Sequence, residues 1–199
     1  PVRFVGNYSS GKMGFALAEE CARRGAEVDF ICGPVSSDMK TQSPLIHRYD
    51  VESAKDMYDR ATLMFPAVDA GILCAAVADF TPETTADEKI KRKGDDMVIR
   101  LKPTQDIAAS LGQMKTEAQI LVGFALETND EKNNAQLKLK KKNLDFIVLN
   151  SLNDEGAGFR CDTNKITIIS VDDEKDFPLK SKAEVAKDIV DELENHIKA

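Results

Sequence analysis

The sequence has little of what metal sites and disulfide frameworks are built from. Its 199 residues include 2 histidines, His47 and His196, and 4 cysteines that lie far apart without a Cys-x-x-Cys pair. Zinc sites need closely spaced Cys and His ligands, and disulfide frameworks belong mainly to short secreted chains. We therefore expect a reduced, cytoplasmic protein with neither kind of site.

Long hydrophobic runs are also missing. The longest uncharged apolar run, 70–78, is far shorter than the ~20 residues of a membrane span, and residues 1–4 lack a signal-peptide pattern. The 27 Lys and Arg against 34 Asp and Glu give a net charge of −7, which disfavours general binding to nucleic acids or anionic membranes. We expect no nucleic-acid or membrane partner, and any phosphate site must be local.

Short apolar runs alternate with helical stripes along the chain. Strands are predicted at 28–31, within 70–78 as a fully buried strand, at 120–125 and at 146–149. Helices are predicted to begin at Ser9 or Ser10 and to end at Gly25, and others to begin at Ser53, Thr104 and Asp130. Apolar strands separated by amphipathic helices favour a doubly wound α/β fold with a mostly parallel sheet.

Two stretches interrupt this alternation. Residues 81–101 are charged, contain the lysine-rich run 89–93 and end in the strand-like segment 97–101, which predicts a protruding arm. Residues 166–171 and 177–179 predict a β-hairpin around an acidic turn, before a final helix from Ser181. Without an internal repeat or a flexible linker, we expect a single domain over 1–199.

The stretch from Gly6 to Met13 comes close to a phosphate-binding P-loop. It has the pattern G-x-x-x-x-G-K, but Met13 stands where a hydroxyl should hold magnesium. The two glycines and two serines still precede a helix, whose free N–H groups favour an anion; a merely capped helix is the alternative. Tyr8 and Lys12 match the Tyr-x-x-x-Lys of short-chain dehydrogenases, but no G-x-G-x-x-G loop accompanies them.

Asp79 follows one buried apolar run and Phe124 lies at the end of another, at the edge where ligands bind in open α/β sheets. Asp79 could meet a ligand there or cap the next turn, and Phe124 could stack on a base, although a core position is favoured. Lys138 and Lys142 lie about 60° and 20° from Ala135 on the helical wheel. They flank the apolar stripe, and two ammonium groups one turn apart favour an anion between them.

Five motifs then occur in one order along the chain. They are VRFVGNYSSGKMG at 2–14, GPVS at 33–36, CAAVADF at 74–80, EKIK at 88–91 and GFALET at 123–128. In this order they resemble bacterial phosphopantothenoylcysteine synthetase, the coenzyme A pathway ligase that is often fused to a decarboxylase. The resemblance covers essentially the whole chain.

The resemblance implies a Rossmann-like homodimer that uses CTP and Mg²⁺, with the metal held mainly by the triphosphate. Such an enzyme activates 4′-phosphopantothenate as an acyl-cytidylate and releases pyrophosphate. The amine of cysteine then displaces CMP. The residues themselves leave CTP and ATP both open, so CTP rests on the resemblance.

The resemblance also implies which residues form the site. Asn7, Arg3 and Lys89 take the catalytic positions, Lys89 on a mobile flap, and Asn7 and Ala76 the substrate positions. The nucleotide positions are Ser9, Ser10, Gly11, Cys74, Ala75, Asp79, Lys89, Gln105, Asp106, Ile107, Ala108, Phe124, Lys138 and Lys142.

This sequence departs from the family at three points. Arg92 replaces an ammonium group at the end of the flap, which keeps the charge but not its geometry. Gln105 stands where a proline is often found. The family also has a strand and a Gly-Gly-Thr loop before the position of Pro1.

Two other functions fit the same fold class. One is an NAD(P)-dependent oxidoreductase, against which the missing G-x-G-x-x-G loop argues. The other is a non-catalytic nucleotide-binding module that keeps the pocket.

Overall fold

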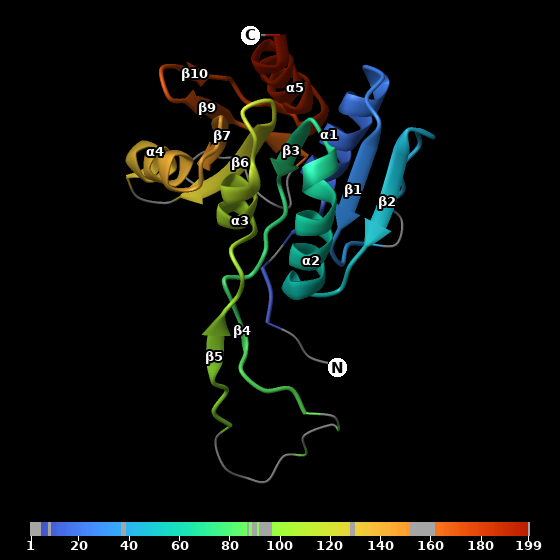
Figure 1. Ribbon diagram of the computed structural model, residues 1–199, viewed down its shortest axis with the longest axis vertical. Coiled ribbons are helices and arrows are strands. Elements are labelled where there is room, and N and C mark those ends of the chain that lie inside the picture. Colours follow the sequence, from blue (N-terminus) through green and yellow to red (C-terminus); the bar gives the residue numbers. More distant parts are fainter. Residues whose placement is uncertain are drawn as a thin grey trace.

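The chain folds around a five-stranded sheet that is parallel over three neighbouring strands at one end and antiparallel at the other (Figure 1). The computed structural model describes residues 5–7, 9–36, 39–86, 88, 91, 97–127, 130–151 and 162–198. The strand order is β10-β9-β7-β6-β3, formed by β3 (Ala70–Leu73), β6 (Ile120–Glu127), β7 (Phe146–Ser151), β9 (Ile166–Ser170) and β10 (Glu174–Asp176). β3, β6 and β7 run parallel, which confirms the predicted mostly parallel α/β sheet.

The burial of β3 differs from the expectation for 70–78. The central strands are covered on both faces, so that Leu121, Val122 and Phe146 are fully buried. β3 ends at Leu73, and all of its residues are only half-buried. The prediction of a fully buried strand was wrong because β3 lies at the end of the sheet order, where it pairs only with β6 among the described strands.

A second sheet of two parallel strands lies near β3 (Figure 1). It consists of β1 (Val28–Cys32) and β2 (Ile46–Asp50), paired from Val28 opposite Ile46 to Cys32 opposite Asp50. β1 confirms the strand predicted at 28–31. β2 was not predicted, because His47, Arg48 and Asp50 interrupt any apolar run.

Helices cover both faces of the five-stranded sheet. α1 (Lys12–Arg23) and α5 (Lys182–Lys198) share one core with β6 and β7, through apolar residues that include Leu17, Val148 and Ile189. The opposite core contains α2 (Ala54–Met64), η1 (Phe65–Ala67), α3 (Ile107–Met114) and α4 (Glu131–Lys141). The predicted doubly wound arrangement is therefore confirmed.

The helix starts agree with the sequence in part. Ser53 caps α2 in a capping box with Asp56, as expected. α1 instead begins after Gly11, which has a φ of 75° and no side-chain cap, so the prediction of Ser9 or Ser10 as the cap was wrong. α3 is capped by Asp106, whose Oδ1 accepts from Ala109 N at 3.0 Å, and the prediction of Thr104 was also wrong.

The C-terminal part forms the predicted hairpin with shifted bounds. β9 pairs antiparallel with β10, and β8 (Thr163–Asn164) pairs antiparallel with β11 (Lys180–Ser181). The second strand of the hairpin is 174–176, so the strand predicted at 177–179 was wrong. α5 begins at Lys182, directly after Ser181, as expected.

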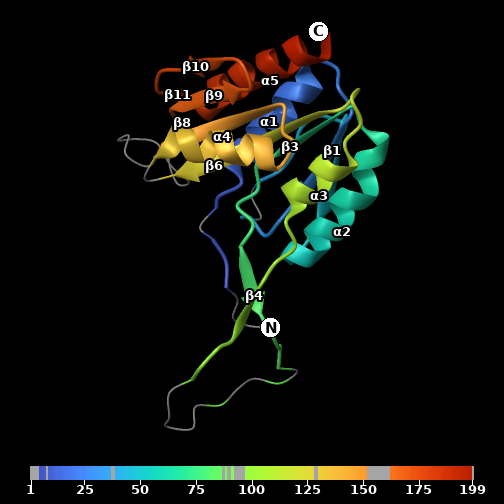
Figure 2. The same cartoon turned by 60° about the vertical axis from the view of Figure 1, so that its left-hand side comes forward.

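A two-stranded arm extends away from the body in both views (Figures 1 and 2). It contains β4 (Phe80–Pro82) paired antiparallel with β5 (Leu101–Pro103). The strand predicted at 97–101 was wrong, since β5 begins only at Leu101. Apolar side chains are exposed along this arm, namely Phe80, Met97, Val98, Ile99 and Leu101.

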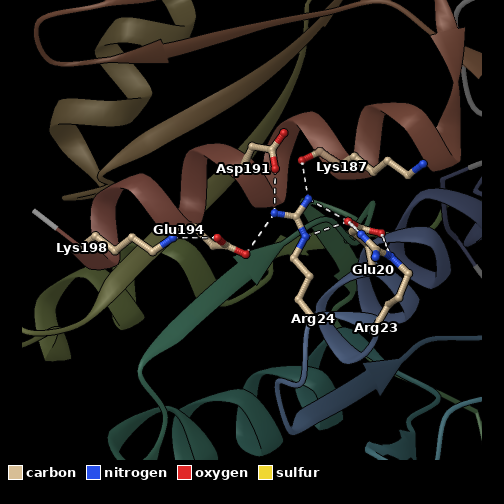
Figure 3. A network of polar contacts seen from close by, with 7 residues as sticks. All are labelled: Glu20, Arg23, Arg24, Lys187, Asp191, Glu194 and Lys198. Carbon is tan, nitrogen blue, oxygen red and sulfur yellow. Dashed lines mark hydrogen bonds and ion pairs between the residues drawn. The ribbon is translucent and has the colours of Figure 1, made fainter.

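A network of charged groups ties α1 to α5 (Figure 3). Glu20 is 6% exposed and accepts hydrogen bonds from Arg23 and Arg24. Arg24 also reaches α5, where it pairs with Asp191 at 2.7 Å and with Glu194 at 3.0 Å. The hydrogen bond from Arg23, together with Arg24 and against the opposing effect of burial, lowers the pKa of Glu20 to about 2.

Candidate functional site

The segment after β3 is held from both sides at the carboxyl edge of the parallel strands. Asn7 Nδ2 donates to the carbonyl oxygens of Ala76 and Val77, at 3.4 and 3.2 Å. On its other side, Thr104 Oγ1 donates to the Ala78 carbonyl oxygen at 2.7 Å and Thr104 N to that of Asp79 at 2.9 Å. The structure thus brings Asn7 to Ala76, and Asp79 to the residues that lead into α3.

The start of α1 has the geometry of an anion-binding turn. Ser9 Oγ accepts from Gly11 N at 3.4 Å, and the N-cap residue, Gly11, makes no side-chain cap hydrogen bond. A Cβ at position 11 would lie 2.7 Å from Val35 Cγ1, so this turn requires glycine for both its φ and its contact. The N–H groups of a helix start and the helix dipole favour a negatively charged group here.

Lys12, at the first position of α1, pairs with Asp162. This contact lowers the pKa of the Asp162 carboxyl below its ordinary value. The Asp162 side chain is 85% exposed and that of Lys12 is 40% exposed, so the pair is worth little to stability.

The two lysines selected by helical periodicity are more buried than the neighbouring lysines. Lys138 and Lys142 are half-buried beside the fully buried Ala135, whereas Lys140 and Lys141 are exposed. The prediction that they flank the apolar stripe is confirmed.

Lys142 meets the start of α3 through an ion pair. Its Nζ lies 3.1 Å from each carboxylate oxygen of Asp106. Burial raises the pKa of Asp106, but the hydrogen bond from Ala109 N–H and the Lys142 ammonium group outweigh it, so this pKa lies below its ordinary value. Two predicted nucleotide positions that are 36 residues apart are therefore in direct contact.

Cys74 and Phe124 lie side by side, one residue beyond the register pair Leu73 and Gly123 of β3 and β6. Both are half-buried against the core shared by α1 and α5. Burial raises the pKa of the Cys74 thiol to about 12, so it is protonated at neutral pH and is no nucleophile. The favoured core position of Phe124 agrees with this packing.

Two predicted site residues, Arg3 and Lys89, fall outside the described residues. Across the ranges that the structure describes, no three His, Cys, Asp or Glu side chains gather in a way that could hold a metal ion. In the same ranges, no helix has the length and apolar character needed to cross a membrane.

Some contacts of the site gave no signal in the sequence. Thr104 was expected to cap α3 but instead holds the segment after β3. The pairing of Lys12 with Asp162 joins residues 150 positions apart, and no local pattern could reveal it. Gly112 allows a close approach between α3 and the turn after α4 that was not foreseen.

Comparison with known proteins identifies the family of the chain. A family model described as DNA/pantothenate metabolism flavoprotein C-terminal domain matches residues 1–197. A relative named cysteine/cysteine sulfinic acid decarboxylase, from an unknown prokaryotic organism, is 57% identical over 191 residues, which cover 96% of this chain and 53% of the relative. The coenzyme A biosynthesis bifunctional protein CoaBC of Bacillus subtilis (strain 168) is 47% identical over 194 residues, 97% of this chain and 47% of that protein.

The fold agrees with these relatives. The crystal structure of the C-terminal domain of coenzyme A biosynthesis bifunctional protein CoaBC superimposes with a TM-score of 0.82 and 36% identity, over 100% of this chain and 88% of that chain. The chain spans about half the length of the curated relatives it matches.

Proposed function

Since the chain belongs to the family of DNA/pantothenate metabolism flavoprotein C-terminal domains, we propose that it joins 4′-phosphopantothenate to cysteine, a step of coenzyme A biosynthesis. The observation that carries this proposal is the ion pair between Lys142 and Asp106. It joins two segments that the family resemblance assigns to the nucleotide, and it places the Lys142 ammonium group at the start of α3. The name of the Bacillus subtilis relative supports the same pathway.

The reaction proceeds in two steps. A carboxylate oxygen of 4′-phosphopantothenate attacks the α-phosphorus of CTP, so that the bond to the β-phosphate oxygen breaks and pyrophosphate leaves. The amine of cysteine then attacks the acyl carbon, loses a proton, and displaces CMP from the acyl-cytidylate. Neither step needs a protein nucleophile, which agrees with the protonated thiol of Cys74.

The residues act mainly by position and charge. Asn7 is anchored to the segment after β3 through its Nδ2, which places its carboxamide beside Ala76. We assign the acyl group to this position. Ser9, Ser10 and Gly11 take the phosphates at the start of α1, and Asp79, Phe124, Gln105 to Ala108, Lys138 and Lys142 take the rest of the nucleotide. Arg3 and Lys89 balance the charge that develops during transfer.

CTP and Mg²⁺ are the proposed co-substrate and metal. In this proposal Mg²⁺ is held mainly by the triphosphate, and we assign it no protein ligand.

The partners follow from the arm and from the relatives. The exposed apolar side chains of β4, β5 and 97–99 suit a second copy of the chain, and we propose a homodimer.

One relative is named a decarboxylase and another a bifunctional protein, and each is about twice as long as this chain. We therefore propose a decarboxylase partner, fused or separate, and a cytoplasmic setting.

The test is pyrophosphate release by the whole encoded protein with 4′-phosphopantothenate, Mg²⁺ and either CTP or ATP, with and without cysteine. We expect release with CTP, and formation of the cysteine adduct only when cysteine is present. Tight CTP binding without release would favour a non-catalytic module. NADPH binding without any effect of CTP would favour an oxidoreductase, and either result would overturn the proposal.

A further inference from the structure

The turn that ends α4 has a defined geometry. Asn143 adopts a left-handed conformation with a φ of 51°. Leu144 N donates to Leu139 O at 3.0 Å, and Asn143 N approaches Lys140 O at 3.4 Å. This is the Schellman pattern, in which a left-handed residue closes the helix end. It fixes the backbone of Lys142, the residue just before the turn.

The same turn packs directly on the backbone of α3. Asn143 Nδ2 donates to Gly112 O at 2.8 Å, a carbonyl near the helix end. A Cβ on Gly112 would lie 1.9 Å from the carbonyl oxygen of Lys142, whereas real Cβ atoms essentially never come closer than 3.0 Å. The two backbones can therefore approach this closely only because residue 112 is glycine.

A second contact fixes the chain immediately after this turn. Lys115 Nζ lies 2.8 and 2.9 Å from the two carboxylate oxygens of Asp145, and Asp145 Oδ2 also accepts from Leu121 N at 2.6 Å. The turn is thus held between Gly112 on one side and Asp145 on the other, and it cannot slide freely along α3.

From this fixed turn the Lys142 side chain runs back along α3. Its ammonium group reaches Asp106 at the start of the helix, six positions and about 9 Å of helix axis from Gly112. Hydrogen bonds to carboxylates weaken quickly beyond about 3.2 Å, so a shift of the Lys142 backbone by an ångström weakens this contact or forces the lysine side chain into another rotamer.

We propose that Gly112 and Asn143 are positioning residues, which set the ammonium group of Lys142 at the start of α3 to receive the nucleotide. This inference rests on the proposed function, in which Lys142 and Asp106 lie in the nucleotide site. In this role Gly112 and Asn143 act through Lys142, by the close approach of the two backbones and the hydrogen bond from Asn143 to Gly112.

Three variants of the whole encoded protein test this role, and Lys142→Met is the reference for a lost ammonium group. Gly112→Ala forces the backbones apart, Asn143→Ala removes both the amide and the ease of the left-handed turn, and Asn143→Gly removes the amide alone. The matched control is Gly25→Ala. Gly25 ends α1 in the same kind of turn with a φ of 94°, far along the chain from Lys142.

We expect Gly112→Ala and Asn143→Ala to raise KM for CTP roughly tenfold, as Lys142→Met does, with a smaller change in kcat. The KM for CTP of Asn143→Gly should lie between that of these variants and that of the wild type. Gly25→Ala should lower the melting temperature without changing KM. Equal loss of stability with a wild-type KM in all three site variants would overturn the proposal.

A titration of the Asp106 carboxyl by NMR gives a readout that does not depend on catalysis. Because Lys142 lowers the pKa of Asp106, this pKa should rise in Asn143→Ala and in Lys142→Met but not in Gly25→Ala. An unchanged pKa in Asn143→Ala would contradict the positioning role. If the wild type releases no pyrophosphate with CTP, the proposed function fails, and the titration still decides whether the turn sets Lys142.

Discussion

Asn7 Nδ2 donates a 3.2 Å hydrogen bond to the carbonyl oxygen of Val77, across 70 positions of sequence. Together with the bond to Ala76, it ties the segment before α1 to the segment after β3. Its donor is an amide, and a carboxylate of the same size cannot replace it, because an ionised carboxylate only accepts hydrogen bonds.

Asn7→Asp is therefore expected to let the acyl-cytidylate form but to slow its conversion. The substitution places a second negative charge near the acyl phosphate, and a like charge at close range costs ~1–4 kcal/mol, or roughly tenfold or more in rate. Mass spectrometry of quenched reactions should find the intermediate accumulating. Normal formation of the cysteine adduct would contradict the role of Asn7.

Lys89→Ala is expected to reduce kcat far more than the affinity for CTP. A flap lysine that meets charge developing in the transition state contributes to turnover, and the loss of one such group costs roughly 100-fold. Steady-state pyrophosphate release and CTP binding measure the two effects. Lys140→Ala, at an exposed position of α4, is the control. Equal turnover in both variants would remove Lys89 from the mechanism.

Local patterns in the sequence were sufficient for several features. The cap of α2 at Ser53 follows from a local residue preference, and the half-buried Lys138 and Lys142 follow from the helical period alone. Each of these features involves a single helix and its ends, where the spacing of residues determines which side chains share a face.

Features that depend on distant residues could not be predicted in this way. Thr104 and Asp106 are equally plausible caps for α3, and the choice is made by Ala78, whose carbonyl oxygen takes the Thr104 hydroxyl. The half-buried state of β3 is likewise decided by its place at the end of the strand order. The contact of Asn7 with Val77 depends on the packing of segments that no spacing relates.

Val98→Asp is expected to break the proposed homodimer. Val98 is 85% exposed in the single chain, so the substitution should change the unfolding free energy of the monomer by less than about 0.5 kcal/mol. In the proposed dimer the same substitution would bury a charge at the interface. Analytical ultracentrifugation should find monomers at concentrations where the wild type is dimeric. Leu63→Asp, on α2 at 74% exposure, should leave the dimer intact. A wild-type protein that is monomeric, or a Val98→Asp variant that remains dimeric, would remove the arm from the interface.

Glu20→Gln is expected to weaken the link between α1 and α5 in a pH-dependent way. The pKa of Glu20 is lowered from 4.5 to about 2 by Arg23 and Arg24, so the folded state binds its proton less readily than the unfolded state does. The stabilisation is complete above pH 4.5 and is lost as the pH falls towards 2. At neutral pH the variant should lose about 1–3 kcal/mol of unfolding free energy, as for a hydrogen-bonded charged group. The difference in unfolding free energy between the variant and the wild type should shrink in urea titrations at successively lower pH.

The control is Glu194→Gln, whose carboxylate is far more exposed beside the same Arg24. This variant should lose less than about 1 kcal/mol of unfolding free energy. Equal costs for the two variants would mean that burial of Glu20 adds nothing to the strength of this link.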